Sequence, residues 1–276
     1  MTAPSAVRPP RLTPDQVSAF REHGYLLCKE PVFDAATFDA LRTHFEDLLA
    51  RWQEDPRMKS PEHMDVPHFM DPGLFRWLLD DAVLDLVEPI LGPDIALFSS
   101  HFICKPAAVG KRVPWHEDSA YWKNRLDPME VVTVWLAIDP STPENGCMRV
   151  IPGTHHHGYS EYEAVDRGTA VFESEIRKGQ FDESRAVDCV LAPGQASLHD
   201  GRLIHGSHAN TGVQRRCGYT MRYISTRTRL LDRDAHRGFQ IYLARGRDHA
   251  GNRYGDPARP NQAWLDAHAD GWPTGH

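Results

Sequence analysis

The sequence predicts a mainly β protein with helices at its N-terminal end. Up to about residue 92, apolar residues recur every three or four positions, as they do on the buried side of a helix. From Ile95 onward, short apolar runs alternate with turn signals that contain Gly or Pro. Many short strands separated in this way are typical of a β-sandwich or a β-barrel.

The 276 residues are expected to form one domain. A chain of this length, 41% hydrophobic and 25% charged, buries a substantial core without disulfide or metal staples. We divide the domain into a helical N-terminal part (12–92), a β-core (about 94–225) and a polar C-terminal tail (227–276) that wraps the outside.

Two helices open the N-terminal part. Thr13-Pro14-Asp15-Gln16 is a capping-box pattern, and Gly24 ends the helix that it begins. A short strand follows at 25–28, and Asp34 caps a second, longer helix. The buried stripe of this second helix consists of Phe38, Leu41, Phe45, Leu48 and Trp52. The stretch 53–70 contains three prolines and is predicted to be a long loop, a feature that often acts as a lid.

The β-core is predicted from seven strand-like runs separated by turns such as Asn145-Gly146, Pro152-Gly153 and Asp200-Gly201. The runs are Ile95–Lys105, Val131–Ile138, Cys147–Ile151, Val187–Leu191, Ala196–His199, Leu203–Ser207 and Arg216–Ile224.

Charge and composition exclude several classes of protein. The net charge of −7 argues against a nucleic-acid-binding surface. There is no apolar run near the ~18 residues of a membrane span. Residues 1–11 lack an apolar segment, so we expect a short disordered leader instead of a signal peptide. The five Cys are scattered and never form a C-x-x-C, which indicates inert, reduced thiols and a cytoplasmic location.

A metal site is indicated by three residues. His116 and Asp118 are two positions apart, so on a strand or strand-edge loop they point to the same side. A surface ion pair is the alternative for this pair taken alone. His205 lies in the apolar run Leu203–Ser207, and Gly206 after it allows a close approach. Two His and one carboxylate form the metal face of non-haem Fe(II) oxygenases.

An arginine supports 2-oxoglutarate as the electron source. The far carboxylate of 2-oxoglutarate needs a cation, and the guanidinium fork matches a carboxylate. Arg216 follows His205 by eleven residues, after a turn at 210–212 that would return the chain beside His205. Strand alternation turns only one of Arg215 and Arg216 inward, so one of the two is a surface cation.

Three sequence blocks, together with the opening order of helix, Gly24-Tyr25 and strand, resemble the phytanoyl-CoA dioxygenase family of Fe(II)/2-oxoglutarate oxygenases. The blocks are Pro114–Asp118, Glu144–His155 and His205–Asn210 with Arg216. The resemblance implies a double-stranded β-helix core, which is a jelly-roll, cupin-like fold. It implies that His116, Asp118 and His205 are the catalytic iron ligands.

The resemblance also assigns residues to the cosubstrate. Arg216 matches the arginine that holds the 2-oxoglutarate C5 carboxylate, and Ser207 matches a hydroxyl beside it. Trp135 and His101 match residues that line the cosubstrate site, although Trp135 is also explained as a core residue. In halogenating relatives a small residue replaces the metal carboxylate. The presence of Asp118 therefore favours hydroxylation or another outcome of hydrogen abstraction.

The substrate pocket is expected between the 53–70 loop, the Tyr121-Trp122 segment and the mouth of the barrel. Its candidate residues are His68, Met64, Tyr121 and Trp122. Alternatively, Tyr121 and Trp122 only support the loop that carries the iron ligands. Lys105, at a strand end before Pro106, is interpreted as a structural or rim charge. The run His155–His157 is interpreted as a solvated loop in preference to a second metal site.

The sequence thus predicts an Fe(II)/2-oxoglutarate dioxygenase that acts on a small molecule, releases succinate and CO2, uses O2 and benefits from ascorbate. Hydroxylation, desaturation, epimerisation and ring formation stay open as outcomes, as do a monomer and a homodimer. We favour a metabolite in secondary-metabolite tailoring, because the acidic net charge disfavours a CoA-linked substrate. The alternatives are a cupin-like metal-binding protein without 2-oxoglutarate and a non-enzymatic module that senses 2-oxoglutarate or oxygen.

Overall fold

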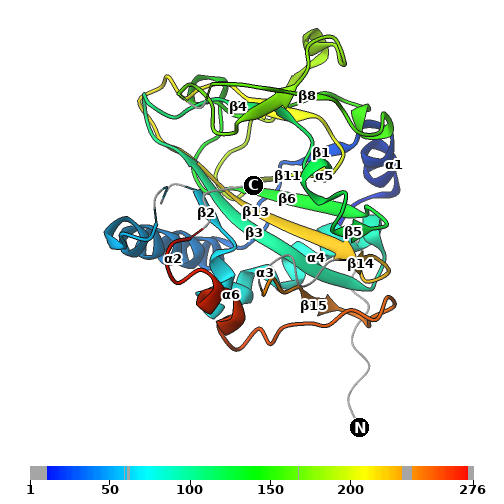
Figure 1. Cartoon of the computed structure of the whole chain (residues 1–276). Coiled ribbons are helices and arrows are strands. Elements are labelled where there is room, and N and C mark those ends of the chain that lie inside the picture. Colours follow the sequence, from blue (N-terminus) through cyan, green and yellow to red (C-terminus); the bar gives the residue numbers. More distant parts are fainter. Residues whose placement is uncertain (1–10, 59, 61–62, 167, 232–237, 273–276) are drawn as a thin grey trace.

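The computed structural model describes residues 11–58, 60, 63–166, 168–231 and 238–272. Its strands form two main antiparallel sheets, and Figure 1 shows them as successive layers, with helices beneath the larger sheet. The prediction of a mainly β chain with helices at its N-terminal end is confirmed. The predicted leader falls almost entirely on residues 1–10, which lie outside the described residues.

The larger sheet has the strand order β1-β11-β6-β13-β3-β15, and β2 pairs with the same edge of β3 as β15 does. Its strands are β1 (Tyr25–Cys28), β2 (His63–Asp65), β3 (Ile95–Lys105), β6 (Val131–Ala137), β11 (Ala196–Asp200), β13 (Arg216–Ser225) and β15 (Tyr242–Arg245).

The smaller sheet has the order β10-β7-β12-β4, and two further strand pairs lie outside the main sheets. The four strands are β4 (Val113–His116), β7 (Met148–Val150), β10 (Val187–Asp188) and β12 (His205–Ser207). The two pairs are β5 (Leu126–Asp127) with β14 (Arg229–Leu230), and β8 (Tyr162–Ala164) with β9 (Ser174–Ile176).

The helices pack mainly against the outer face of the larger sheet (Figure 1). They are α1 (Pro14–His23), α2 (Ala35–Glu54), α3 (Phe75–Leu78), α4 (Asp81–Leu91), α5 (Ser119–Trp122) and α6 (Gln262–Ala267), with 3-10 turns η1 (Pro67–Phe69), η2 (Pro72–Leu74), η3 (Pro143–Asn145), η4 (Thr154–His156) and η5 (Glu183–Arg185). The capping box of Thr13 and Gln16 is formed, Gly24 adopts a left-handed C-cap and the predicted stripe of α2 is buried.

Two segments depart from the sequence-based expectations. The stretch 53–70 is not a free loop from His63 onward, because β2 pairs with β3 and Val66 N donates to Ser100 O at 2.9 Å. Residues 59, 61 and 62 of that stretch lie outside the described residues. The tail does more than wrap the outside, since β15 extends the larger sheet and Trp264 of α6 joins the core. Strands this short leave little periodic pattern in a sequence.

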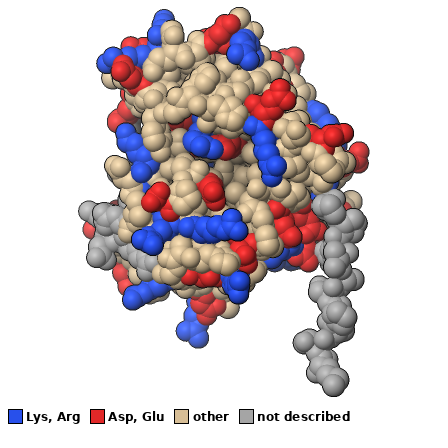
Figure 2. Space-filling model, turned by 90° about the vertical axis from the view of Figure 1, so that its right-hand side faces the viewer, with Lys and Arg blue, Asp and Glu red and all other residues tan. Residues whose placement is uncertain are grey.

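Charges of both signs are interspersed on the face shown in Figure 2. Within the described ranges, no helix has both the length and the apolar character needed to cross a bilayer.

Close packing between β13 and β6 fixes one side of the space between the sheets. Gly218 of β13 lies against the Trp135 ring, and a Cβ atom at position 218 would lie 2.0 Å from Trp135 Cζ2. The indole therefore occupies the volume that a side chain at position 218 would fill.

Gly218→Ala is expected to lower the free energy of unfolding by about 1–3 kcal/mol, because the added methyl group must displace the buried indole. Urea unfolding measures the change. Gly271→Ala is the control, since its nearest neighbouring atom would lie 4.0 Å from the new Cβ. Equal stabilities of the two variants would contradict the close packing of Gly218 and Trp135.

Candidate metal and cosubstrate site

Two histidines meet across the smaller sheet. His116 ends β4, His205 begins β12 and the two residues are register partners. The His116 Nδ1 lies 2.8 Å from Pro114 O, and the His205 Nδ1 lies 2.9 Å from Leu203 O. A carbonyl can only accept, so each Nδ1 carries the proton and each Nε2 presents a lone pair. This tautomer is the one that a metal-ligating imidazole needs.

Asp118 completes a buried group of metal donors. It follows β4 at the start of α5, and its Oδ1 lies 3.8 Å from His116 Nε2. One donor atom from each of His116, Asp118 and His205 lies within 4.8 Å of the other two, and all three side chains are buried. Two imidazoles and one carboxylate fit Fe(II) and leave coordination positions open for other ligands.

The Asp118 carboxylate is held ionised by its neighbours. Burial by itself raises the pKa of Asp118, but the Arg222 guanidinium and the nearby imidazoles outweigh burial and hold this pKa well below its usual range. Arg222 Nε donates to Asp118 Oδ2 at 3.3 Å, and His199 Nε2 lies 3.9 Å from the same oxygen. Burial, followed by the neighbouring imidazoles His116 and His199, lowers the pKa of His205 well below its usual value. The donors are therefore in their ligating forms at neutral pH.

His199 and Arg222 are residues that the sequence-based prediction missed. His199 lies in β11, within a predicted strand, and a search for every His in an apolar strand would have found it as it found His205. Arg222 lies six positions after Arg216 in β13, so alternation places both on the same face of the sheet. Both residues line the cavity described below.

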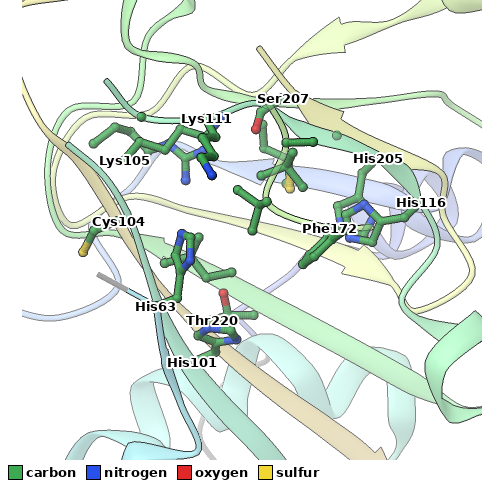
Figure 3. A pocket seen from close by; sticks show the side chains of 18 of the residues that line it. His63, His101, Cys104, Lys105, Lys111, His116, Phe172, His205, Ser207 and Thr220 are labelled. Carbon is green, nitrogen blue, oxygen red and sulfur yellow. The ribbon is translucent and has the colours of Figure 1, made fainter. Parts of the chain in front are cut away.

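One cavity of about 450 Å³ connects the metal donors to the predicted cosubstrate residues. It lies between the two sheets, and Figure 3 shows His116, His205 and Phe172 on one side and Lys105 and Lys111 on another. Four cationic side chains line it, against two carboxylates. The cations are Lys105, Lys111, Arg216 and Arg222, and the carboxylates are Asp118 and Glu173. The cavity is thus basic in a chain with a net charge of −7.

The predicted cosubstrate residues all line this cavity. Arg216 points inward as alternation allows, with its guanidinium carbon 5.3 Å from the centre of the Trp135 ring. Arg215 points outward, where it is ion-paired with Glu46 and Asp139. Ser207 lies in β12, on the cavity side of the smaller sheet.

His101 lies on β3 opposite Thr220 of β13, and both side chains line the cavity (Figure 3). The His101 Nδ1 lies 3.8 Å from Asp65 Oδ1 of β2. The structure thus gives His101 a position from which it can contact a bound cosubstrate.

The four predicted substrate residues separate into different environments. Tyr121 lines the cavity, with its ring centre 6.3 Å from that of His116. Trp122 is buried, and the Arg222 guanidinium carbon lies over its indole ring, 5.2 Å from the ring centre. In this position Trp122 supports the loop that carries Asp118. His68 and Met64 are fully buried and do not line the cavity.

Core packing explains the position of His68 and Met64. The His68 Nδ1 is 2.7 Å from Ser100 Oγ, and burial lowers the pKa of His68 to about 3, which keeps it neutral. Met64 belongs to the main hydrophobic core. The expectation that they line the substrate pocket is corrected, because Met64 in strand β2 and His68 in the 3-10 turn η1 are both fully buried in the core.

The structure also bears on the predictions for Lys105, for the run His155–His157 and for the cysteines. Lys105 is not a rim charge, since its side chain is 1% exposed and its Nζ donates to His208 O. Of the run predicted to be a solvated loop, His156 and His157 are exposed as expected. His155 is instead buried, and its Nε2 donates to Arg21 O of α1 at 3.0 Å. The five Cys are free thiols, and all except Cys28 are buried.

The chain is similar in sequence to known proteins. A sequence model described as "Phytanoyl-CoA dioxygenase (PhyH)" matches residues 20–218. A Caenorhabditis elegans protein named "Phytanoyl-CoA dioxygenase domain-containing protein 1 homolog" is 30% identical over 160 residues, which cover 56% of this chain and 55% of that protein. Human peroxisomal phytanoyl-CoA dioxygenase is 29% identical over 224 residues, covering 72% of this chain and 64% of the human protein. The chain thus spans less than two thirds of each relative.

A solved structure described as the apo form of the non-heme monooxygenase ThoJ is also similar. The TM-score is 0.73 at 26% identity, and the alignment covers 92% of this chain and 94% of that chain. The predicted jelly-roll, cupin-like fold class is therefore confirmed by a match over nearly the whole length.

His205→Ala is expected to weaken Fe(II) or Co(II) binding by more than about 100-fold, because even outer partners of metal ligands contribute 10–100-fold. An anaerobic metal titration with analysis of bound metal measures the change. His157→Ala, at an exposed position, is the matched control and should bind one ion per chain like the wild type. Full occupancy of the His205 variant at stoichiometric metal would exclude His205 as a ligand.

In the Arg222→Met variant, metal binding is expected to be lost at a higher pH than in the wild type. Arg222 lowers the pKa of Asp118, so its removal raises this pKa, and protonation then competes with the metal at a higher pH. Metal titrations between pH 5 and 8 measure the shift, and Arg222→Lys, which keeps the charge, is the control. Coincident pH profiles of the wild type and the Met variant would contradict this electrostatic role.

Proposed function

Because the chain belongs to the phytanoyl-CoA dioxygenase family, we propose that it is an Fe(II)- and 2-oxoglutarate-dependent dioxygenase that hydroxylates a small molecule. The observation that carries the proposal is a single cavity with three metal donors at one side and Arg216, Ser207 and Trp135 around the rest of its wall. To use 2-oxoglutarate, the protein must hold a metal ion and must bind the carboxylate at the other end of the cosubstrate.

When bound at His116, Asp118 and His205, Fe(II) supplies the activation of O2 with electrons from 2-oxoglutarate, which leaves as succinate and CO2. The protein contributes ligation and orientation. Arg222 and His199 hold the Asp118 carboxylate from the side of its Oδ2, and the carbonyls of Pro114 and Leu203 orient the imidazoles.

Arg216 provides the fixed cation for the distal carboxylate of 2-oxoglutarate in this proposal. Its Nε and Nη2 donate to Gly146 O at 3.2 and 2.9 Å, which anchors the guanidinium before the ligand arrives. Trp135 packs beside it and restricts its movement. An arginine that is anchored in this way loses little conformational entropy when it binds a carboxylate.

The proposed substrate is a small metabolite, of the kind modified in secondary-metabolite tailoring. A cavity of about 450 Å³ that also holds 2-oxoglutarate leaves room for a small molecule. Tyr121 and Phe172 lie beside His116 and present aromatic surface to such a substrate, with ring centres 6.3 and 4.9 Å from that of His116. Hydroxylation is favoured over halogenation because Asp118 occupies the carboxylate position.

The decisive experiment supplies the wild type with Fe(II), 2-oxoglutarate, O2, ascorbate and a panel of metabolites, and measures succinate together with products that gain one oxygen atom. We expect succinate from the wild type and a loss of more than about 100-fold in Asp118→Ala, which lacks a metal ligand. Glu163→Ala, at an exposed position, is the matched control. Metal binding without 2-oxoglutarate binding would contradict the proposal in favour of a metal-binding protein. Binding of 2-oxoglutarate without any turnover would favour a sensing module.

A further inference from the structure

Two cysteines face each other across central strands of the larger sheet. Cys104 of β3 and Cys217 of β13 are register partners, although they are 113 positions apart in the sequence. Opposed residues in antiparallel strands have Cα atoms about 4.5 or 5.5 Å apart. Both values lie within the ~4.4–6.8 Å that usually separate the Cα atoms of a disulfide. The strand register therefore holds the two residues at the spacing that a disulfide requires.

The side chains of this pair also approach each other. The two Sγ atoms lie 2.6 Å apart. Non-bonded carbon atoms attract most strongly at ~3.5–4.0 Å, and sulfur is larger than carbon, so the two thiols are closer than ordinary packing brings them. The sulfur atoms of a disulfide are ~2.05 Å apart. Only a small further approach is therefore needed for a covalent bond.

The other cysteines do not share this arrangement. All five cysteines are described by the structure, and among them only Cys104 and Cys217 have sulfur atoms within hydrogen-bonding distance of each other. Cys147 and Cys189 are also buried, and Cys28 is half-buried. Oxidation that depends on the proximity of two thiols is therefore directed to one pair.

The cavity gives a small oxidant a route to this pair. Both side chains are almost completely buried, at 2% and 0% exposure, and both belong to the main hydrophobic core. Cys104 nevertheless also lines the cavity, and Figure 3 shows it across from His116 and His205. A small molecule that enters the cavity therefore meets Cys104 first, with Cys217 directly beside it.

We propose that Cys104 and Cys217 are an oxidation site, at which hydrogen peroxide converts the two thiols into a disulfide between β3 and β13. The Cys104 sulfur attacks one peroxide oxygen, the O–O bond breaks, and a sulfenic acid and one water form. The Cys217 sulfur then attacks the sulfenic sulfur and displaces a second water. The two sulfurs together lose two electrons, which reduce the peroxide, and the two thiol protons leave in the waters. This inference does not depend on the proposed function.

The disulfide is expected to stabilise the fold. A cross-link between positions so far apart in the sequence restricts the unfolded chain, and this effect grows with the length of the loop that is closed. The native strands need little rearrangement, because the sulfur atoms are already close. Burial raises the pKa of the Cys217 thiol well above its usual value. Since the thiolate is the reactive form, we expect the oxidation to be slow, and the experiment uses a long incubation.

The test exposes the full-length protein, loaded with Zn(II), to hydrogen peroxide overnight. Zn(II) has no redox chemistry and therefore generates no radicals from the peroxide. In the unfolded, unreduced product the number of titratable thiols should fall from five to three. Peptide mass mapping should find one linked pair, which contains Cys104 and Cys217. The melting temperature should rise by about 5–15 °C relative to the untreated protein.

Cys28→Ala is the matched control, because it removes a thiol outside the pair. It should form the same linked peptides and gain the same rise in melting temperature. Cys104→Ala and Cys217→Ala should each form no linked pair and gain no rise, and circular dichroism establishes that they are folded.

Three results would overturn the inference. They are retention of all five thiols by the wild type, linkage through any other cysteine, and an unchanged melting temperature of the linked protein. The peptide map of the wild type decides the site of oxidation even if neither alanine variant of the pair folds.

Discussion

The register of β12 against β4 is the constraint on which the rest of the site depends. It sets His205 opposite His116, and a slip of one residue would turn His205 to the other face of the sheet. Gly206 permits this pairing, since a Cβ atom there would lie 3.0 Å from Val113 O and 3.2 Å from the Trp115 ring. The metal donors are thus positioned by backbone pairing within one small sheet.

The larger sheet faces this metal group with cations, and the cavity is therefore electrostatically divided. Beside the imidazoles, Arg222 balances the buried Asp118 carboxylate. At the other side, Lys105 and Arg216 have no balancing carboxylate among the described residues. A ligand with one chelating end and one anionic end complements both sides. Net charge gave no indication of this division, because the carboxylates that make the chain acidic lie mostly outside the cavity.

Sequence patterns located the long strands well and the short ones poorly. The predicted run Ile95–Lys105 coincides with β3, and the predicted run at 216–224 lies within β13. Strand β2 has three residues and follows a proline-rich stretch, so neither alternation nor composition distinguished it from a loop. His68 and Met64 were assigned to the pocket for the same reason, because residues in a loop have no predictable inward or outward side.

The sequence by itself determined the fold class, the succession of the long strands along the chain and the residues that share a face within one strand. Strand alternation, for example, requires Arg216, Thr220 and Arg222 to point the same way. Only the tertiary structure decided which side chains meet across strands and sheets, as when Lys105 faces Arg216 or His199 approaches Asp118. The physical reason is that side-chain direction follows from local backbone geometry. Contacts between distant segments instead depend on strand register and sheet packing, which no short stretch of sequence encodes.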